Sequence, residues 1–82
     1  MSRIVWEVAA KNNLARYRKD DPAGVDQVLD SVNLLGSNPR PSGARDCGEG
    51  KYRMHVGRYR VWYTIRQNQP VVIAIDLVGR IP

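Results

Sequence analysis

The stretch KYRMHVGRYRVWYTI, residues 51–65, decides the fold of this chain of 82 residues. Apolar and polar residues alternate on both sides of Gly57 and Arg58, and this alternation is typical of a half-buried antiparallel hairpin. Only these two residues separate Val56 from Tyr59, and a glycine at the first central position predicts a type II′ turn. Because such a turn fixes the register, it also fixes which side chains share a face.

The predicted register separates two faces of different composition. The first face is mostly apolar and is expected to lie under helices. It holds Tyr52, Met54, Val56, Tyr59, Val61, Tyr63 and Ile65. The second face is expected to stay uncovered. It holds Lys51, Arg53, His55, Arg60, Trp62 and Thr64, with His55 opposite Arg60 and Arg53 opposite Trp62.

The segments on either side of the hairpin predict an α+β domain. Strands are expected at Arg3–Val8 and Val71–Val78, helices at Ala9–Lys19 and Pro22–Leu35, and a long loop at Ser37–Gly50. Asp21 is the expected N-cap of the second helix. The order is β-α-α-β-β-β, with two N-terminal helices packed on one face of a small antiparallel sheet. One domain is expected to span residues 1–82, because so short a chain supports only one modest core.

Burial determines the expected pairing of the last strand with the hairpin. A three-residue turn at Gln67–Gln69 puts its large aliphatic side chains on the helix-covered face, and each stabilises the fold by about 1.5–3 kcal/mol when buried. These side chains are Val71, Ile73, Ile75 and Leu77. The same register places Asp76 opposite Arg60, where the carboxylate is expected to hold the guanidinium in place. Membership of Asp76 in a catalytic group is the alternative.

The net charge of +5 comes from one part of the sequence. Residues 40–66 account for all of it, with Arg40, Arg45, Lys51, Arg53, Arg58, Arg60 and Arg66 against Asp46 and Glu49. So local a positive field attracts polyanions or acidic protein segments, although a basic surface that only favours solubility is the alternative. Arginines bind phosphate groups through paired hydrogen bonds, and an indole ring stacks on bases. The uncovered face therefore fits single-stranded RNA better than duplex DNA, for which the sequence offers no basic helix.

Other features of the sequence exclude several classes of protein and site. The longest apolar run, Val71–Ile75, is far too short to span a membrane, and no signal peptide opens the chain, so a cytoplasmic protein is expected. The single cysteine, Cys47, has no partner for an internal disulfide and no histidine at a motif spacing for a thiol nucleophile. The sequence has no Cys/His cluster, so neither a metal site nor a small-molecule cofactor is expected.

Two motifs make the sequence similar to a known family of bacterial proteins. YRMHVGRYRVWYTI, followed by VVIAIDLVGR, resembles the RelE/ParE toxin superfamily of type II toxin–antitoxin systems, and the resemblance extends to the first strand, the two helices and the NPRPSG loop. It implies a RelE-like fold and a cognate antitoxin as partner. RelE-like members are ribosome-dependent mRNA endonucleases (mRNA interferases) that act in the ribosomal A site, whereas ParE-like members inhibit gyrase. The hairpin motif does not separate these two activities.

The resemblance to RelE-like members also implies roles for single residues. It implies a metal-free endoribonuclease in which the ribose 2′-OH attacks its own 3′ phosphodiester. Arg53 and His55 lie where two basic residues of the family's second strand are expected, and Arg60 matches the arginine of the Tyr-Arg-Val-x-Tyr element. Arg80 lies close to the basic position after Gly79, so the expected catalytic residues are Arg53, His55, Arg60 and Arg80. The expected RNA-binding residues are Arg45, Lys51, Arg58, Trp62 and Arg66.

The chemistry of such a reaction singles out His55. Phosphodiester transfer needs a base, an acid and stabilisation of the developing charge. His55 is the only histidine and is expected to be neutral beside Arg60, so it is the candidate base or acid; a solvated strand residue is the alternative. The arginines of the same face are expected to hold the phosphate, and Trp62 or Tyr52 to support the nucleotide. Glu49 in the loop is a weaker candidate for the base.

The C-terminal end departs from the family pattern. Family members usually continue after the glycine of the last strand into a basic segment and a tyrosine, whereas this sequence ends with GRIP, residues 79–82. A non-catalytic binding protein is therefore the alternative expectation, either a ParE-like gyrase inhibitor or a decayed toxin with a shortened C-terminus that still binds its antitoxin. A generic RNA-binding domain is a third class, but the sequence lacks the long basic or aromatic pattern typical of one.

Overall fold

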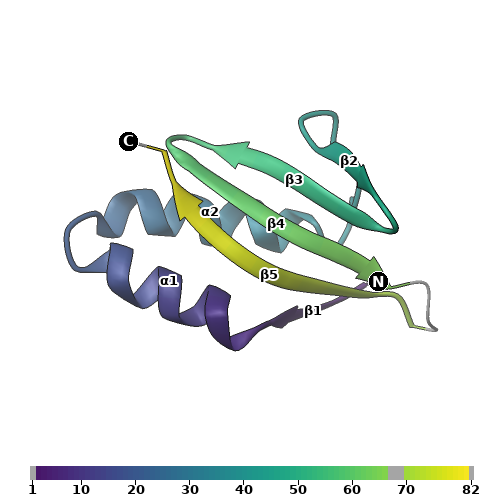
Figure 1. The fold of residues 1–82 in the computed structure, drawn as a ribbon, viewed down its shortest axis with the longest axis horizontal. Helices are drawn as coiled ribbons and strands as arrows, with labels where there is room; N and C mark the ends of the chain where they lie inside the picture. Colours follow the sequence, from purple (N-terminus) through teal and green to yellow (C-terminus); the bar gives the residue numbers. More distant parts are fainter. Residues whose placement is uncertain (1, 67–69, 82) are drawn as a thin grey trace.

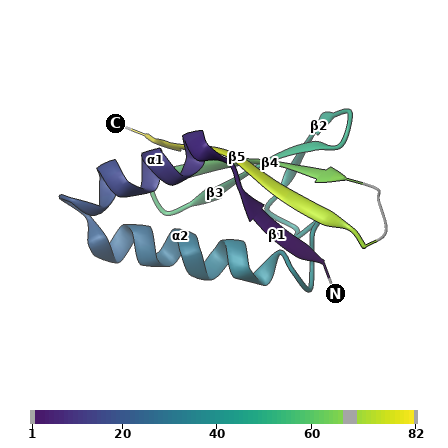
Figure 2. The same cartoon turned by 90° about the horizontal axis from the view of Figure 1, so that it is seen from below.

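The protein consists of two layers in a computed structural model that describes residues 2–66 and 70–81. Helices α1 (Val8–Arg18) and α2 (Pro22–Leu34) lie against one face of a five-stranded sheet (Figures 1 and 2). The strands are β1 (Arg3–Trp6), β2 (Arg45–Gly48), β3 (Lys51–Val56), β4 (Tyr59–Arg66) and β5 (Val72–Arg80). Their order in the sheet is β1-β5-β4-β3-β2. The predicted α+β class and the two helices on one face of the sheet are confirmed.

The sheet has two features that the sequence does not predict. β1 pairs with β5 in parallel, so the sheet is mixed, while its other neighbouring strands are antiparallel. The sequence predicts a loop over residues 37–50, but β2 forms there and pairs with β3. All four residues of β2 are exposed, so its sequence has no alternation of buried and exposed positions by which to recognise a strand.

The helices begin where the local sequence provides a start signal. Asp21 Oδ1 accepts a hydrogen bond of 3.1 Å from the backbone N–H of Gly24, and Pro22 is the first residue of α2, as predicted. α1 begins at Val8, which the sequence assigns to the first strand; in the structure this side chain is 71% exposed. The predicted end of the first strand is therefore wrong, because the chain already turns into the helix there.

The β3–β4 hairpin has the register that the sequence predicts. Its pairs run from Val56 with Tyr59 at the turn to Lys51 with Thr64 at the far end. Gly57 has a φ of 60°, a left-handed value that favours glycine and that the first central position of a type II′ turn requires. The turn therefore places the side chains of both strands on the faces expected for them.

The predicted register between β4 and β5 is wrong. Arg60 pairs with Gly79 instead of Asp76, and Trp62 pairs with Leu77. At the start of the ladder Arg66 already pairs with Val72 instead of Pro70, and one extra residue of β5 at a β-bulge, opposite the middle of β4, shifts the later pairs by one more. The expected contact between Arg60 and Asp76 is therefore absent from the hairpin's uncovered face.

The bulge also changes which side chains of β5 point to the helices. Beyond the bulge the alternation of the strand is shifted by one residue. Val78 is consequently 1% exposed, whereas Leu77, which is predicted to be buried, is 43% exposed. The turn predicted at residues 67–69 lies outside the described residues.

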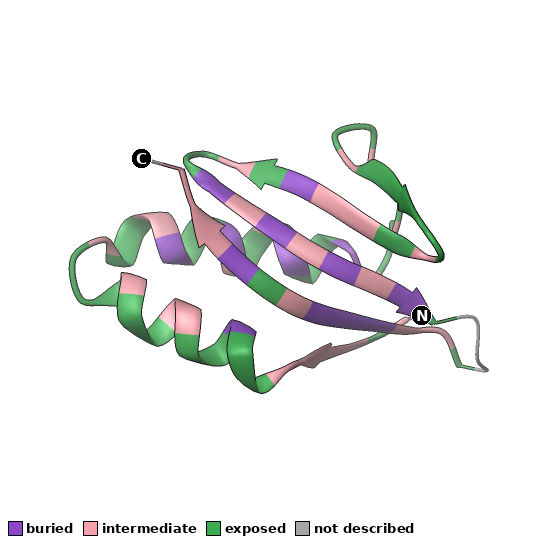
Figure 3. Cartoon of the chain, in the orientation of Figure 1, coloured by how far each residue is buried: buried purple, intermediate pink, exposed green. Residues whose placement is uncertain are grey.

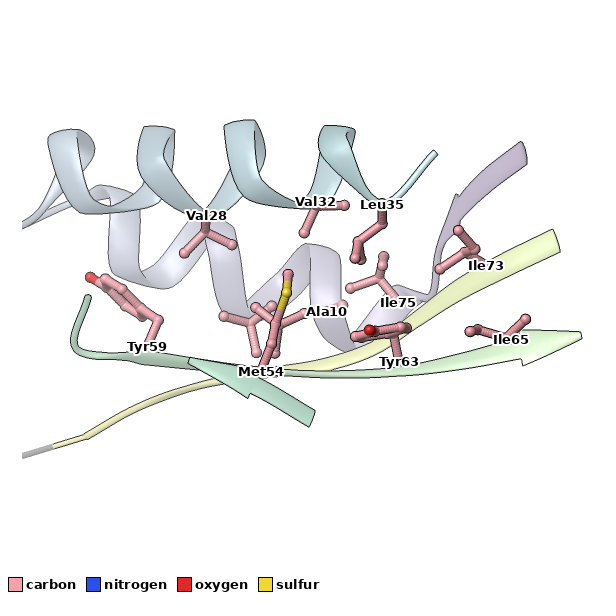
Figure 4. Close-up of a cluster of buried hydrophobic side chains, with 12 residues drawn as sticks. Ala10, Val28, Val32, Leu35, Met54, Tyr59, Tyr63, Ile65, Ile73 and Ile75 are labelled. Carbon is pink, nitrogen blue, oxygen red and sulfur yellow. The ribbon is translucent and has the colours of Figure 1, made fainter. Parts of the chain in front are cut away.

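The core lies between the helices and the sheet, as Figures 3 and 4 show. Every second residue of β4 is buried, so its apolar side chains point to the helices. The largest fully buried side chains are Tyr59, Tyr63, Leu35, Ile73, Ile75, Val25, Val28, Val32, Val61 and Val78. No helix covers the opposite side of the sheet in the described part of the chain, and this side is called the open face below.

Candidate functional site

The open face carries the cationic surface that the sequence predicts, and Figure 1 looks onto it. Arg53 faces Trp62 and His55 faces Arg60 across β3 and β4. β2 adds Arg45, which faces Arg53 from the other side. Arg53, His55 and Arg60 therefore share one face of the sheet, as expected from the register of the hairpin.

His55 and Arg60 are in direct contact. The Nε–H of Arg60 donates a hydrogen bond of 2.9 Å to Nε2 of His55. A ring nitrogen that accepts a hydrogen bond carries no proton, so this contact suits the form of the imidazole with its hydrogen on Nδ1. The neutral form of His55 stays a prediction. The pair thus combines a fixed cation with a lone pair that is able to accept a proton.

Four cations of the open face lack an acidic partner. Among the described residues, no carboxylate lies within 4.0 Å of the side-chain nitrogens of Arg45, Lys51, Arg53 or Arg60. Arg45 also faces Arg53 directly, and like charges opposite each other on neighbouring strands destabilise a sheet. The open face therefore keeps a local excess of positive charge that a bound polyanion would relieve.

The other two predicted RNA-binding arginines lie at opposite ends of β4. Arg58 Nε is 4.0 Å from Asp21 Oδ2, and Arg66 Nη2 is 3.6 Å from Glu7 Oε1. The two arginine side chains are 60% and 51% exposed, so each ion pair is a weak surface contact. Arg58 and Arg66 thus each have an acidic partner, unlike the four cations above.

Arg80 does not lie with the other predicted catalytic residues. It pairs with Tyr59 across the strands, so its side chain belongs to the helix-covered face. Its Nη1 donates hydrogen bonds of 3.1 Å to both carboxylate oxygens of Asp20, and its guanidinium lies 4.7 Å from the ring centre of Tyr17. The hydrogen bond to Asp20 raises the pKa of Arg80. The bulge in β5 thus turns Arg80 to the face opposite the other three expected catalytic residues, and its catalytic role stays a prediction.

Asp21 and Tyr59 make a second contact on the helix-covered face. Tyr59 Oη donates a hydrogen bond of 2.7 Å to Asp21 Oδ2. This bond, together with the one from the N–H of Gly24, holds the pKa of Asp21 below its usual range, and burial raises the pKa of Tyr59. The contact ties the hairpin turn to the start of α2. The sequence identifies Asp21 only as a cap, because a partner 38 residues away leaves no local pattern.

The remaining candidates are held in other contacts. Asp76, in the bulge of β5, accepts a hydrogen bond of 2.6 Å from Thr64 Oγ1 rather than forming an ion pair. Tyr52 stacks on Tyr63 with 5.6 Å between ring centres. Because that stack lies on the helix-covered side of the sheet, Tyr52 is not placed to support a nucleotide on the open face. Glu49 occupies the turn between β2 and β3 with a φ of 56°.

Two hollows adjoin the hairpin. The smaller, of about 210 Å³, is lined by Arg60, Trp62, Gly79, Arg80 and Ile81. The larger, of about 380 Å³, lies between the end of α2, the following loop and β3. Its lining is largely apolar and includes Leu34, which is 68% exposed, as well as Met54 and His55. The smaller hollow is thus lined by a cation and an indole, and the larger hollow mainly by aliphatic side chains.

Metal ligands do not cluster in the described part of the chain. Within residues 2–66 and 70–81, no three His, Cys, Asp or Glu side chains come together in a way that would hold a metal ion. Cys47 is an exposed free thiol. The helices in these ranges are too short or too polar to cross a membrane.

Comparisons with solved structures identify the fold. A YoeB/ParE toxin from Agrobacterium tumefaciens matches with a TM-score of 0.80 at 12% identity, over 95% of this chain and 96% of that chain. The toxin–antitoxin complex RelBE2 from Mycobacterium tuberculosis matches with a TM-score of 0.77 at 18% identity, over 95% of each chain. A mutant of Escherichia coli toxin RelE in the free state matches with a TM-score of 0.75 at 17% identity, over 95% of this chain and 81% of that chain.

Sequence comparison identifies the family. A search of curated proteins found no match. The family model described as the ParE toxin of type II toxin–antitoxin system, parDE, matches residues 4–80, which take in both helices and, apart from Arg3, the strands β1 to β5. The match therefore spans nearly the whole chain, and the resemblance noted on the hairpin motifs is confirmed. This chain belongs to the ParE toxin family, within the RelE/ParE superfamily of type II toxin–antitoxin toxins.

Proposed function

We propose that this toxin is a ribosome-dependent mRNA endonuclease whose open face binds single-stranded RNA. The observation that carries the proposal is the 2.9 Å hydrogen bond from Arg60 to His55, on a face where Arg45, Lys51 and Arg53 have no acidic partner among the described residues. Arg53 lies on the same face, one strand from Arg60. A proton acceptor and two phosphate-binding groups are therefore within reach of one phosphodiester.

In the proposed reaction, the ribose 2′-oxygen attacks the adjacent phosphorus. Arg53 and Arg60 hold the non-bridging oxygens and stabilise the charge that develops on them. As Arg60 turns from the imidazole to the phosphate, Nε2 of His55 becomes free to accept the proton of the 2′-hydroxyl. The bond between the 2′-oxygen and phosphorus forms, and the bond to the 5′-oxygen breaks. The leaving oxygen takes a proton from solvent or from the His55 imidazolium, giving a 2′,3′-cyclic phosphate and a 5′-hydroxyl end.

Cleavage of mRNA on programmed ribosomes tests this proposal. Arg60→Ala is expected to lower the cleavage rate by at least about 100-fold, and His55→Ala by about 100-fold, because each removes a group needed in the transition state. Arg18→Ala is the control, because it also removes one positive charge but acts on an exposed residue of α1 that pairs with Asp26. Equal cleavage by the parent and by His55→Ala would exclude the catalytic role of the histidine.

Inhibition of gyrase is the second candidate function. The matching family model is that of ParE toxins, and Arg80 is engaged with Asp20 instead of completing a cluster of four basic residues on the open face. A supercoiling assay separates the two functions. Gyrase inhibition that persists in Arg60→Ala, with no cleavage of ribosome-bound mRNA by the parent, would replace the first proposal with this one. Inactivity in both assays with retained antitoxin binding would identify a decayed toxin.

We also propose a cognate antitoxin as the partner of this toxin. Two matched structures, RelBE2 from Mycobacterium tuberculosis and YoeB–YefM from Staphylococcus aureus, are toxin–antitoxin complexes. The uncompensated cations of the open face suit an acidic segment, and the aliphatic hollow beside β3, with Leu34 at its margin, suits the apolar side of that segment. Co-purification of the toxin with the product of an adjacent gene tests this, and Leu34→Asp is expected to weaken the complex.

A further inference from the structure

The hollow of about 210 Å³ on the open face is shaped by a contact between Trp62 and Gly79. A Cβ atom built on Gly79 would lie 3.1 Å from Cζ3 and 3.4 Å from Cη2 of Trp62. The benzene end of the indole therefore lies close over the backbone of β5, and a side chain at this position would make the ring shift by a few tenths of an ångström. Arg60, which pairs with Gly79, lies beside this contact and lines the same hollow.

The bulge in β5 brings this glycine to the open face. Without the extra residue, the pairing of the strand's first half would continue and would place Val78 opposite Arg60. With it, Val78 is buried under the helices and Gly79 faces Arg60 instead. The hollow thus depends on two features of β5, the bulge and the glycine at position 79. Gly79 is on the open face, so packing of the core does not require a glycine there.

The lining of the hollow indicates the chemistry of its ligand. The guanidinium of Arg80 is bound to Asp20, so Arg60 supplies the cation, and none of the lining residues is acidic. The indole of Trp62 is partly exposed and offers an aromatic surface next to that cation. The ligand that suits the hollow is an anionic group joined to a planar ring, because the anion binds Arg60 and the ring stacks on Trp62.

We propose that this hollow is a nucleotide subsite, in which one unpaired base of RNA stacks on Trp62 while the adjoining phosphate binds Arg60, and that Gly79 determines its size. The inference rests on the proposed RNA-binding function of the open face and deepens it. In this inference, Gly79 sets the position of the indole, and the indole determines which ligands fit the hollow. Gly79 itself does not touch the reacting atoms.

Fluorescence of Trp62 measures the stacking directly. The chain has two tryptophans, so Trp6→Phe leaves Trp62 as the reporter. The probe is a short single-stranded RNA carrying 2′-O-methyl groups, which prevent attack by the 2′-oxygen. At low salt, the RNA is expected to quench the emission of Trp62 as it binds, because a stacked base is in contact with the indole.

Substitution of Gly79 tests the role of the space beneath the indole. Gly79→Ala is expected to weaken RNA binding by at least about fivefold, and Gly79→Val by at least about 20-fold, because their side chains displace the indole and fill the hollow. Stability is expected to be equal or higher, since glycine weakens a strand. Gly43→Ala is the matched control: its Cβ would meet nothing within 4 Å, and neither glycine has a left-handed φ. It is expected to change binding by less than about twofold.

The outcomes separate this inference from the proposed function. Quenching by RNA that Gly79→Ala weakens and Gly43→Ala preserves would support the subsite. RNA that binds with unchanged Trp62 emission, or that binds Gly79→Ala as tightly as the parent, would overturn it and leave the open face as an RNA-binding surface. Failure of the probe to bind the parent would also overturn it, and cleavage on programmed ribosomes would then decide the proposed function separately. If Gly79→Val does not fold, Trp62→Leu provides the second test, since Gly79→Ala must have no further effect in its background.

Discussion

Arg60 and Arg80 occupy neighbouring pairs of the same two strands but have opposite surroundings. Arg60 pairs with Gly79 on the open face, where its Nε–H binds His55. Arg80 pairs with Tyr59 on the helix-covered face, where Asp20 accepts two hydrogen bonds from it. The charge of Arg80 is thus paired within the protein, whereas Arg60 has no acidic partner among the described residues. The face and the partners of an arginine, rather than its position near a motif, decide its role.

The difference extends to the two faces as a whole. On the helix-covered face, hydrogen bonds join β4 to distant segments of the chain. Tyr59 binds Asp21, and Tyr63 Oη donates a hydrogen bond of 2.8 Å to the carbonyl oxygen of Pro39. On the open face, Arg45 and Arg53 face each other without an acid between them. The first arrangement stabilises the folded chain, whereas the second is tolerated at some cost in stability and suits a polyanion.

The largest difference between the two arginines is expected when Arg60 and Arg80 are each replaced with lysine. Arg60→Lys keeps the charge but loses the Nε–H that binds His55 and the fork that binds phosphate, so cleavage should fall by about 30-fold or more with an unchanged Tm. Arg80→Lys is expected to leave the cleavage rate within about twofold. Rates on programmed ribosomes and thermal melts measure both. A similar loss of cleavage in Arg80→Lys, at unchanged stability, would place Arg80 in the reaction.

Removal of Asp21 is expected to affect stability and leave RNA binding unchanged. Asp21→Ala loses the cap of α2 and the acceptor of the Tyr59 hydroxyl, which should lower the Tm by on the order of 5–10 °C. The folded state lowers the pKa of Asp21, so its contribution is present above the ordinary carboxyl range and is lost as the pH falls through the folded pKa. Melts at pH 7 and in acid should therefore differ more for the parent than for the variant. RNA binding by Asp21→Ala at a temperature where it is folded is the control.

Tyr63→Phe is expected to change the alkaline limit of stability. Loss of the hydrogen bond to Pro39 should lower the free energy of unfolding by about 1 kcal/mol near neutral pH. Burial raises the pKa of Tyr63 to about 12, above the 10.0 of a free tyrosine, so its contribution is complete below pH 10.0 and is lost as the pH rises to about 12. Denaturant unfolding across this interval measures the effect. Parallel pH profiles of parent and variant would contradict the assignment of this loss to Tyr63.

The smallest expected effect concerns the salt dependence of RNA binding. Arg53→Ala should reduce the slope of log affinity against log salt by about 0.7, the value for one phosphate contact of a single strand. Arg80→Ala should leave the slope unchanged, because its charge is already paired with Asp20. Titrations of the 2′-O-methyl RNA at several salt concentrations measure both slopes. Equal reductions in the two variants would remove the distinction between the open and covered faces.

The hairpin and its cationic side were predictable because both follow from short-range features. Alternation assigns the faces, and Gly57 fixes the turn that brings His55 opposite Arg60. β2 was not predictable, since its residues are exposed and only their pairing with β3 makes them a strand. The same limit applies to the contact of Asp21 with Tyr59, which joins distant parts of the sequence.

The bulge in β5 explains why the sequence does not reveal on which face Arg80 lies. Val71–Ile75 is a continuous apolar run, and Asp76 follows it as an ordinary polar position, so nothing in the sequence marks Asp76 as an extra residue. Burial of Val78 in place of Leu77 becomes visible only when the helices are in position. A shift of one residue then reverses the face of every later side chain, including Arg80.

The exposed strand β2 has a consequence for how the cationic surface moves. All four of its residues are exposed, so detaching it from β3 disrupts few contacts beyond the backbone ladder. Local opening of lowest free energy is therefore expected at this margin, and its amide hydrogens should exchange with solvent earlier than those of β4. Such opening separates Arg45 from Arg53 while the core stays intact. The outermost cation of the surface is thus the one whose position adjusts to a ligand at the least cost to the fold.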